Sequence, residues 1–201
     1  QADQTRTAQM ELQQLTEKRA QLTTQIADQR QLLASVNREL SSSQSRQAAL
    51  QADLQALDQR IRSLKLNQRD ADIEALRGRL NWPVDGRVIR RFGQRRDDGF
   101  GTWQGLVISA TTNAEVRAVQ AGKVAYAGYL LGYGLVVVVA HNNGHATIYG
   151  HNARVLVSTG DPIAAQQAIA IAGNTGSLEI SGLYFGVTKN GQAINPRPWL
   201  N

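Results

Sequence analysis

The chain has 201 residues, and its halves differ in composition: all four prolines and every glycine lie after residue 77, so two modules are expected. The absence of cysteine excludes disulfides, thiolate zinc sites and cysteine nucleophiles, and no apolar run is long enough to span a bilayer. The net charge of +6 would suit an acidic partner, but basic residues are scattered among acidic ones, so no nucleic-acid partner is expected.

A helical repeat fills residues 1–64. Steps of three and four residues from Leu12 to Leu64 reach sixteen positions, of which twelve are apolar, while the residues between them are mostly polar. Such a seam of period 3.5 is buried only against another helix with the same seam, so a coiled coil is predicted. Because the repeat is already running at Gln1, the coiled coil is expected to be a fragment of a longer one.

Two questions about this coiled coil stay open. Residues 40–47 place Ser43 and Gln47 on the seam, which is compatible with a bend between two antiparallel helices or with one continuous helix. The seam itself could be a spacer or oligomerisation device, or it could be a docking surface for a partner helix.

Residues 65–81 are expected to form a short amphipathic helix or linker. Only Ile73, Leu76 and Leu80 keep helical spacing there, and Gly78 marks an end. Trp82-Pro83 then stops any helix, because proline disfavours the helical conformation in the residue before it. The segment is predicted to be either a short lid on the second module or a plain linker.

The second module, residues 82–201, is predicted to be all β. Short apolar runs alternate with turn signals, and two Asn-Gly pairs, at 143–144 and 190–191, are typical of tight hairpins. Residues 135–140, LVVVVA, are apolar on both faces and are expected to form a central strand. The predicted fold class is therefore α + β in separate modules, with N-terminal coiled-coil helices followed by an all-β domain.

The order of segments in the second module resembles the LytM or lysostaphin-type domain of bacterial cell-wall endopeptidases. The residues that carry the resemblance include WPVDGRVIRRFG, WQGLVISA, GYGLVVVVAH, YGHN and INPRPWL. Enzymes of this family hold one zinc ion with an HxGxD motif and the second histidine of an HxH motif, and two further histidines assist the bound water. The resemblance implies a lysostaphin-type peptidase fold over residues 82–201.

The metal ligands of that pattern are missing here. Trp103 and Val107 stand where the ligating histidine and aspartate would be, Gly182 replaces a catalytic histidine, and Tyr184 replaces the metal-binding one. His151 alone matches a family histidine, and that one assists catalysis without holding metal. Indole, isopropyl and phenol groups do not replace imidazole and carboxylate around zinc. We therefore expect no metal, no cofactor, no catalytic residue and no enzyme activity.

Two further histidines, His141 and His145, flank the first Asn-Gly turn. No carboxylate or third histidine is placed near them in sequence, so they are predicted to be surface side chains and not metal ligands.

A zinc-less LytM-like domain behind a coiled coil resembles the EnvC-type activators of cell-wall amidases. That resemblance implies a periplasmic protein of cell division whose coiled coil engages an FtsE-FtsX membrane complex. It further implies that the vacated active-site groove binds the autoinhibitory helix of a peptidoglycan N-acetylmuramoyl-L-alanine amidase and so releases hydrolysis by that partner. The positions implied to line the groove are Trp103, Gln104, Val107, Tyr133, Val136, Tyr149, His151 and Tyr184.

The residue types agree with this use, because valine, tryptophan and tyrosine in place of metal ligands predict an apolar groove with phenol hydroxyls at its rim, suited to an amphipathic helix. Two alternatives remain. A passive peptidoglycan-binding or scaffold protein would bind glycan without accelerating an amidase. A zinc endopeptidase with an unusual site would hold stoichiometric zinc and cleave peptide bonds.

Overall fold

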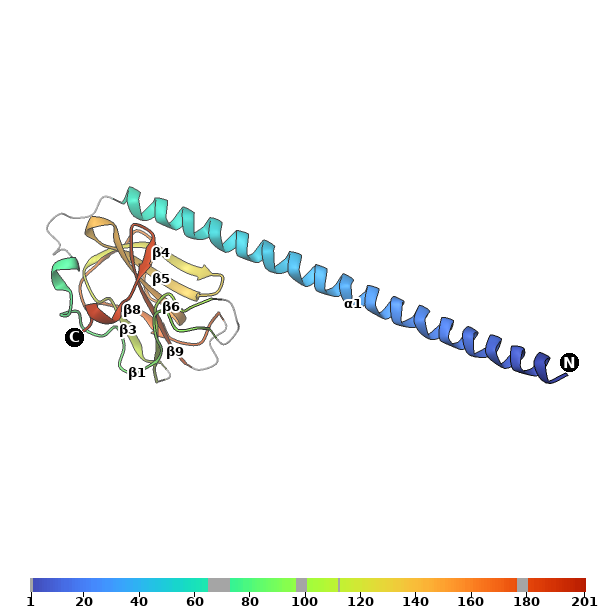
Figure 1. Cartoon of the computed structure of the whole chain (residues 1–201). Coiled ribbons are helices and arrows are strands. Elements are labelled where there is room, and N and C mark those ends of the chain that lie inside the picture. The colour runs from blue at the N-terminus through green and yellow to red at the C-terminus, as the bar shows by residue number, and fades with distance from the viewer. Residues whose placement is uncertain (1, 65–72, 97–100, 112, 177–180) are drawn as a thin grey trace. The chain divides into compact units, whose positions relative to one another are not determined.

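The computed structural model describes residues 2–64, 73–96, 101–111, 113–176 and 181–201, with side chains from residue 12 onward. The chain divides into two units, Gln1–Ala49 and Leu50–Asn201. The first unit is helical, and the second contains the end of the same helix and all the strands (Figure 1).

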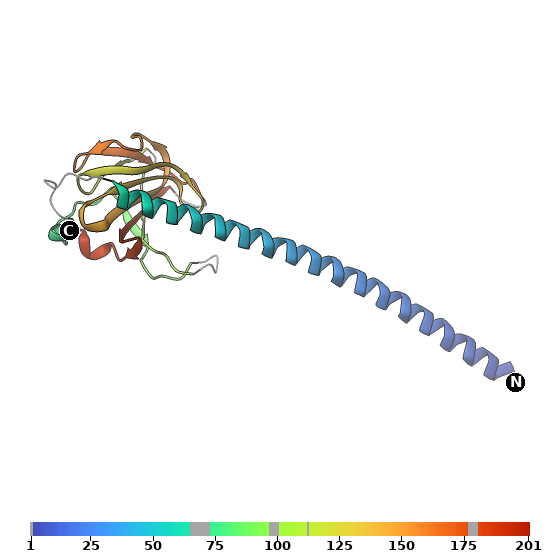
Figure 2. The ribbon, with the colours of Figure 1, turned by 90° about the horizontal axis from the view of Figure 1, so that it is seen from above.

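Helix α1 spans Ala2–Ser63 and continues through residues 40–47 without interruption (Figure 2). The structure therefore favours one continuous helix over a bend between two antiparallel helices. Apolar seam residues from Leu12 to Leu40 are exposed, as expected of a face that awaits another helix. Among the described residues, no helix is both long enough and apolar enough to cross a membrane.

The strands of the second unit form one antiparallel sheet in the order β1-β2-β9-β6-β5-β4-β7, with β10 paired to β9 and β8 joining β3 to β6. Their bounds are β1 Arg87–Arg90, β2 Leu106–Ser109, β3 Glu115–Arg117, β4 Gly122–Leu130, β5 Gly134–Ala140, β6 His145–Val155, β7 Pro162–Ile163, β8 Ala168–Ala172, β9 Gly182–Lys189 and β10 Gln192–Ile194. Short 3₁₀ helices are η1 Ile73–Leu76, η2 Asn142–Gly144 and η3 Arg197–Trp199.

Both predicted hairpins and the predicted central strand are confirmed. The Asn-Gly pairs at 143–144 and 190–191 join β5 to β6 and β9 to β10, and all four residues have positive φ. Strand β5 lies between β4 and β6 and is buried on both faces.

One face of the sheet carries the main core. Leu106, Phe185, Tyr149 and Val137 lie opposite one another on the adjacent strands β2, β9, β6 and β5, and all four belong to this core. Since successive side chains of a strand point to opposite faces, their sequence neighbours face the other way.

The other face, which we call the groove face, carries Val107, Tyr184 and Gly150 in one cross-strand row. The next row across β9, β6 and β5 contains Gly186, Ile148 and Val138. A second apolar cluster, which includes Val136, Val138 and Ala146, lies on this face.

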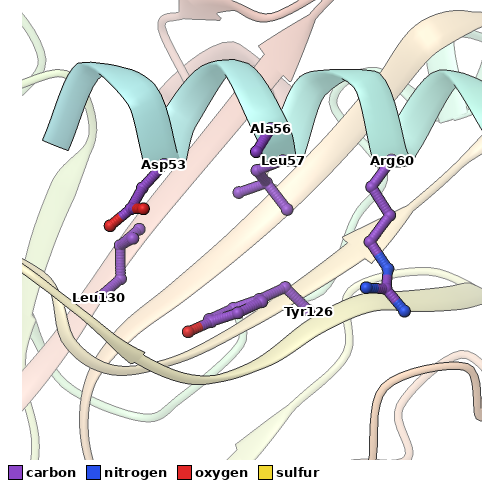
Figure 3. A pocket seen from close by; sticks show the side chains of 6 residues that line it. All are labelled: Asp53, Ala56, Leu57, Arg60, Tyr126 and Leu130. Atoms are coloured by element: carbon purple, nitrogen blue, oxygen red, sulfur yellow. The ribbon is translucent and has the colours of Figure 1, made fainter. Parts of the chain in front are cut away.

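The last turns of α1 pack on this second cluster through Leu50, Leu57, Ile61 and Leu64. Figure 3 shows Leu57 above the ring of Tyr126. A cavity of about 230 Å³ opens beside them, lined by Asp53, Ala56, Leu57, Arg60, Tyr126 and Leu130. Between residues 50 and 64 the apolar seam of α1 therefore packs on the sheet of the same unit and not on another helix.

Residues 73–80 are not a lid on the groove face. Ile73 is fully buried and Leu80 almost so, both in the main core, and Leu80 forms a parallel bridge with Leu200. The spacing of the three apolar residues was compatible with a lid or a linker, but their burial makes this segment part of the domain itself. Residues 65–72 lie outside the described residues.

The two turn-flanking histidines are buried, so the prediction that they are surface side chains is wrong. Both ring nitrogens of His141 are bonded: Nδ1 donates to the Ala121 carbonyl and Nε2 accepts from the Thr147 hydroxyl, each at 2.9 Å. The His145 ring packs edge-on against Trp199, with centroids 5.5 Å apart. The bonds of His141, and the Asn142 carbonyl 3.3 Å from His145 Nδ1, make this burial possible.

Acid is expected to weaken the fold through His141. Burial lowers the pKa of this imidazole from 6.5 to about 4, so the folded state resists a proton that the unfolded chain accepts. The stabilisation is complete above pH 6.5 and is lost as pH falls toward 4, up to about 3 kcal/mol in all. Urea unfolding at pH 7, 5 and 4 should show a shallower pH dependence for His141→Gln than for the native chain. Equal slopes would assign the acid sensitivity to other groups.

Candidate functional site: a vacated metal position

The ring of Tyr184 lies against two glycines. A Cβ atom on Gly105 would stand 2.7 Å from Tyr184 Cζ, and one on Gly186 would stand 3.1 Å from Tyr184 Cε1. Both positions must therefore lack a side chain for the ring to lie there. The sequence reasoning missed these glycines, although a glycine inside a strand pattern such as Gly186 signals close approach.

Tyr133, Tyr184 and His151, three of the residues predicted from the resemblance, come together at this point. The rings of Tyr133 and Tyr184 meet edge-on with centroids 5.0 Å apart, and that of His151 meets Tyr184 at 6.2 Å. The backbone fixes the arrangement, because the His151 N–H donates to the Tyr133 carbonyl at 2.7 Å. Tyr184 and His151 are buried, while Tyr133 is half-buried.

All three side chains are neutral near pH 7. Burial raises the pKa of Tyr184 well above 10 and also raises the pKa of Tyr133. Burial lowers the pKa of His151, against a backbone hydrogen bond from its ring, and the positive charge of Arg96 adds to the lowering. The site is therefore uncharged except for the influence of Arg96.

His151 is held in an uncommon backbone conformation, with φ of 63°. Its Nδ1 lies 2.6 Å from the Thr175 carbonyl. A carbonyl only accepts, so Nδ1 carries the proton, and Nε2 of the neutral ring is left with a lone pair.

Trp103 stands at the position of a zinc-binding histidine, and its backbone pairs with that of residues 93 and 94. Its carbonyl accepts from the Gly93 N–H at 2.8 Å, and its own N–H donates to the Gln94 carbonyl at 2.9 Å. The guanidinium carbon of Arg96 lies 4.4 Å from the centre of the indole ring, within cation–π range. Arg96 was visible in the sequence only as part of a basic cluster, and its place beside the site was missed.

The other predicted residues have different surroundings. Gln104 is exposed and bonds through Nε2 to Thr102. Val107 and Val136 are fully buried, and both lie on the groove face.

Tyr149 must be removed from the predicted groove. It pairs with Phe185, whereas its neighbour Gly150 pairs with Tyr184, so alternation turns Tyr149 toward the main core. Its hydroxyl accepts from the Val119 N–H at 3.0 Å, and burial raises its pKa to about 12. Tyr149 was predicted to line the groove because it lies close to His151 in sequence, but its side chain lies in the main core and not at the site.

The donor set at this position does not fit zinc. The three ligand positions hold an indole, an isopropyl group and a neutral, buried phenol, at Trp103, Val107 and Tyr184. Within the ranges that the structure describes, no three histidine, cysteine, aspartate or glutamate side chains form a group that could hold a metal ion. What remains is a shaped site on a rigid sheet, lined by apolar and neutral polar groups.

Comparison with known families shows which family this domain is part of. The family model described as peptidase family M23 matches residues 101–196. This part of the chain belongs to peptidase family M23. The replaced ligand positions therefore occur within a family of peptidases.

Curated relatives of the M23 domain include two hydrolase activators. The murein hydrolase activator EnvC of Escherichia coli is 43% identical over 135 residues, 67% of this chain and 32% of that protein. The murein hydrolase activator NlpD of Salmonella dublin is 34% identical over 120 residues, 59% of this chain and 30% of that protein. The chain thus spans about a third of the length of either relative.

The fold also matches solved structures. The antimicrobial peptidase lysostaphin of Staphylococcus simulans aligns with a TM-score of 0.52 and 25% identity, over 57% of this chain and 48% of that one. The lysostaphin-type fold expected from the sequence is confirmed, and so is a fold class of one N-terminal helix followed by a β-domain.

Proposed function

We propose that the M23 domain is a noncatalytic activator, which binds a peptidoglycan N-acetylmuramoyl-L-alanine amidase and displaces the helix that inhibits it. The observation that carries this proposal is the replaced donor set, with Trp103, Val107 and Tyr184 at the three ligand positions. These three positions lack the imidazole and carboxylate groups that zinc-dependent hydrolysis requires. Similarity to the activators EnvC and NlpD supports the same role.

The groove face is suited to a helix, because one already packs there. Leu50, Leu57 and Ile61 of α1 lie at intervals of seven and four residues, the spacing of one helical face, and they cover apolar residues of the sheet. A partner helix with apolar residues at that spacing would compete for this surface. Tyr133, half-buried beside the second cluster, offers an aromatic anchor at its edge.

The exposed seam of α1 suits a second partner. Its apolar residues between Leu12 and Leu40 are exposed, and a helix from a membrane complex of the FtsE-FtsX type would bury them. We further propose a periplasmic location, where such a complex, the amidase and peptidoglycan meet.

The deciding experiment is an amidase assay on purified peptidoglycan, with and without the full chain. We expect the amidase to release material faster in the presence of the chain, and the chain alone to release none, with or without added zinc. Binding to peptidoglycan without acceleration of any amidase would support a passive scaffold instead. Cleavage by the chain alone, dependent on bound zinc, would establish an endopeptidase.

A further inference from the structure

The vacated metal position contains an acceptor without a donor. His151 uses Nδ1–H on the Thr175 carbonyl, so Nε2 of the neutral ring presents a lone pair. That nitrogen makes no hydrogen bond in the described part of the chain, and it is not among the polar atoms sealed from solvent there. A ligand that reaches it must supply a proton to share.

The same position contains donors without acceptors. The Tyr133 and Tyr184 hydroxyls share one hydrogen bond, which leaves one of their two protons to be donated, and Tyr133 is the less buried of the two. The indole Nε1–H of Trp103 is buried and has no hydrogen-bond partner among the described residues. That nitrogen is sealed from solvent, so the donor open to a ligand at this position is the tyrosine hydroxyl.

An open acceptor and an open donor on rings that both contact Tyr184 match a carboxamide, which presents a carbonyl oxygen and an NH₂ group on one carbon. A carboxylate has only acceptors, so it would oppose the Nε2 lone pair unless His151 took up a proton. We propose that the vacated metal position binds the side-chain carboxamide of an asparagine or glutamine carried by the partner's helix. The amide must come from a side chain, because the backbone groups inside a helix are bonded to one another. This inference rests on the proposed function and names the chemistry that the site recognises.

As pH falls below 7, His151 is the group at this site that is expected to take up a proton. Tyr133 and Tyr184 have raised pKa values, and Arg96 keeps its charge throughout. Protonation of Nε2 removes the acceptor, so binding should weaken as pH falls through the pKa of His151, by up to tenfold per pH unit. A carboxylate ligand would give the opposite sign, because it would raise that pKa.

The test measures the affinity of the full chain for the purified amidase that it accelerates, by calorimetry from pH 8 to pH 5. We expect weaker binding in acid for the native chain and a flat profile for His151→Phe, which keeps a ring but lacks the acceptor. Tyr133→Phe removes the donor and keeps the aromatic contact, so it should weaken binding by about five- to tenfold at pH 7.5. Tyr129→Phe, at an exposed tyrosine of the neighbouring hairpin, is the matched control and should change nothing.

Affinity that rises in acid would replace the carboxamide by a carboxylate. Unchanged affinity in Tyr133→Phe together with a flat native profile would remove the subsite while leaving amidase activation in place. A native chain that neither binds nor accelerates any amidase would overturn the proposed function, and the subsite with it. Circular dichroism of each variant separates loss of binding from loss of folding, and the native pH profile needs no variant.

Discussion

Changing both Leu57 and Ile61 to aspartate should tighten amidase binding by about ten- to a hundredfold. Both side chains are partly buried against the second apolar cluster, and each contributes roughly 1 kcal/mol to keeping α1 on the groove face. A partner helix that needs the same surface binds only the fraction of molecules in which it is open, and the substitutions raise that fraction. Titration of the variant and native chains with the amidase measures the gain.

The control for this change lies on the same turns of the helix. Leu54 is exposed, so Leu54→Asp adds one negative charge to the same turns without uncovering the sheet and should leave affinity within about twofold. If Leu54→Asp raised affinity as much as the double variant, charge on the helix would be the cause and not release of the groove face. Unchanged affinity in the double variant would mean that the amidase binds elsewhere.

Val107→Asp should lower the free energy of unfolding by about 3 kcal/mol or more at pH 7. Val107 is fully buried in β2 opposite Tyr184, so the new carboxylate would be desolvated beside an apolar strand and a neutral phenol. Burial would raise the carboxyl pKa above its unfolded value. The penalty is therefore complete above that raised pKa and shrinks as pH falls toward 4.

Val107→Ala separates charge from lost volume. It leaves a small cavity but no charge, so its cost should stay constant with pH while that of Val107→Asp declines in acid. Neither variant should retain zinc on elemental analysis, because Trp103 and Tyr184 still occupy the other ligand positions. A stably folded Val107→Asp chain that holds stoichiometric zinc would contradict our interpretation of the site.

Local patterns were sufficient for much of the fold. Asn190-Gly191 predicts its hairpin because both residues tolerate positive φ, and the apolar run of β5 predicts a strand covered on both faces. Residues 73–80 show the limit of such patterns. Their apolar spacing identifies a buried stripe, but only contact with the far end of the chain, at Leu200, shows which surface buries it.

The residue types at the candidate site could be predicted from the sequence. Which face of the sheet each side chain occupies could not, because that depends on how the strands pair. Tyr133, His151 and Tyr184, which the resemblance placed in one site, are in ring contact, whereas their role in binding stays a prediction. Tyr149 failed because its face is decided by a strand partner 36 positions away, the pairing with Phe185. Arg96 lies beside the site because residues 93–96 pair with the segment that contains Trp103. This pairing leaves no periodic pattern in the sequence from which it could have been predicted.

The glycines that accommodate the Tyr184 ring also bear on how far the domain stands from a metal site. Zinc chemistry at this position would require histidine at 103 and 184 and aspartate at 107, and no single exchange yields a metal site. Each alone is harmful, because Trp103→His loses the Arg96 stack, Val107→Asp buries a charge, and Tyr184→His leaves space beside Gly105 and Gly186. Selection for hydrolysis would reward none of the intermediates. A zinc site at this position would therefore need all three exchanges together, so zinc chemistry is not within reach of a single substitution.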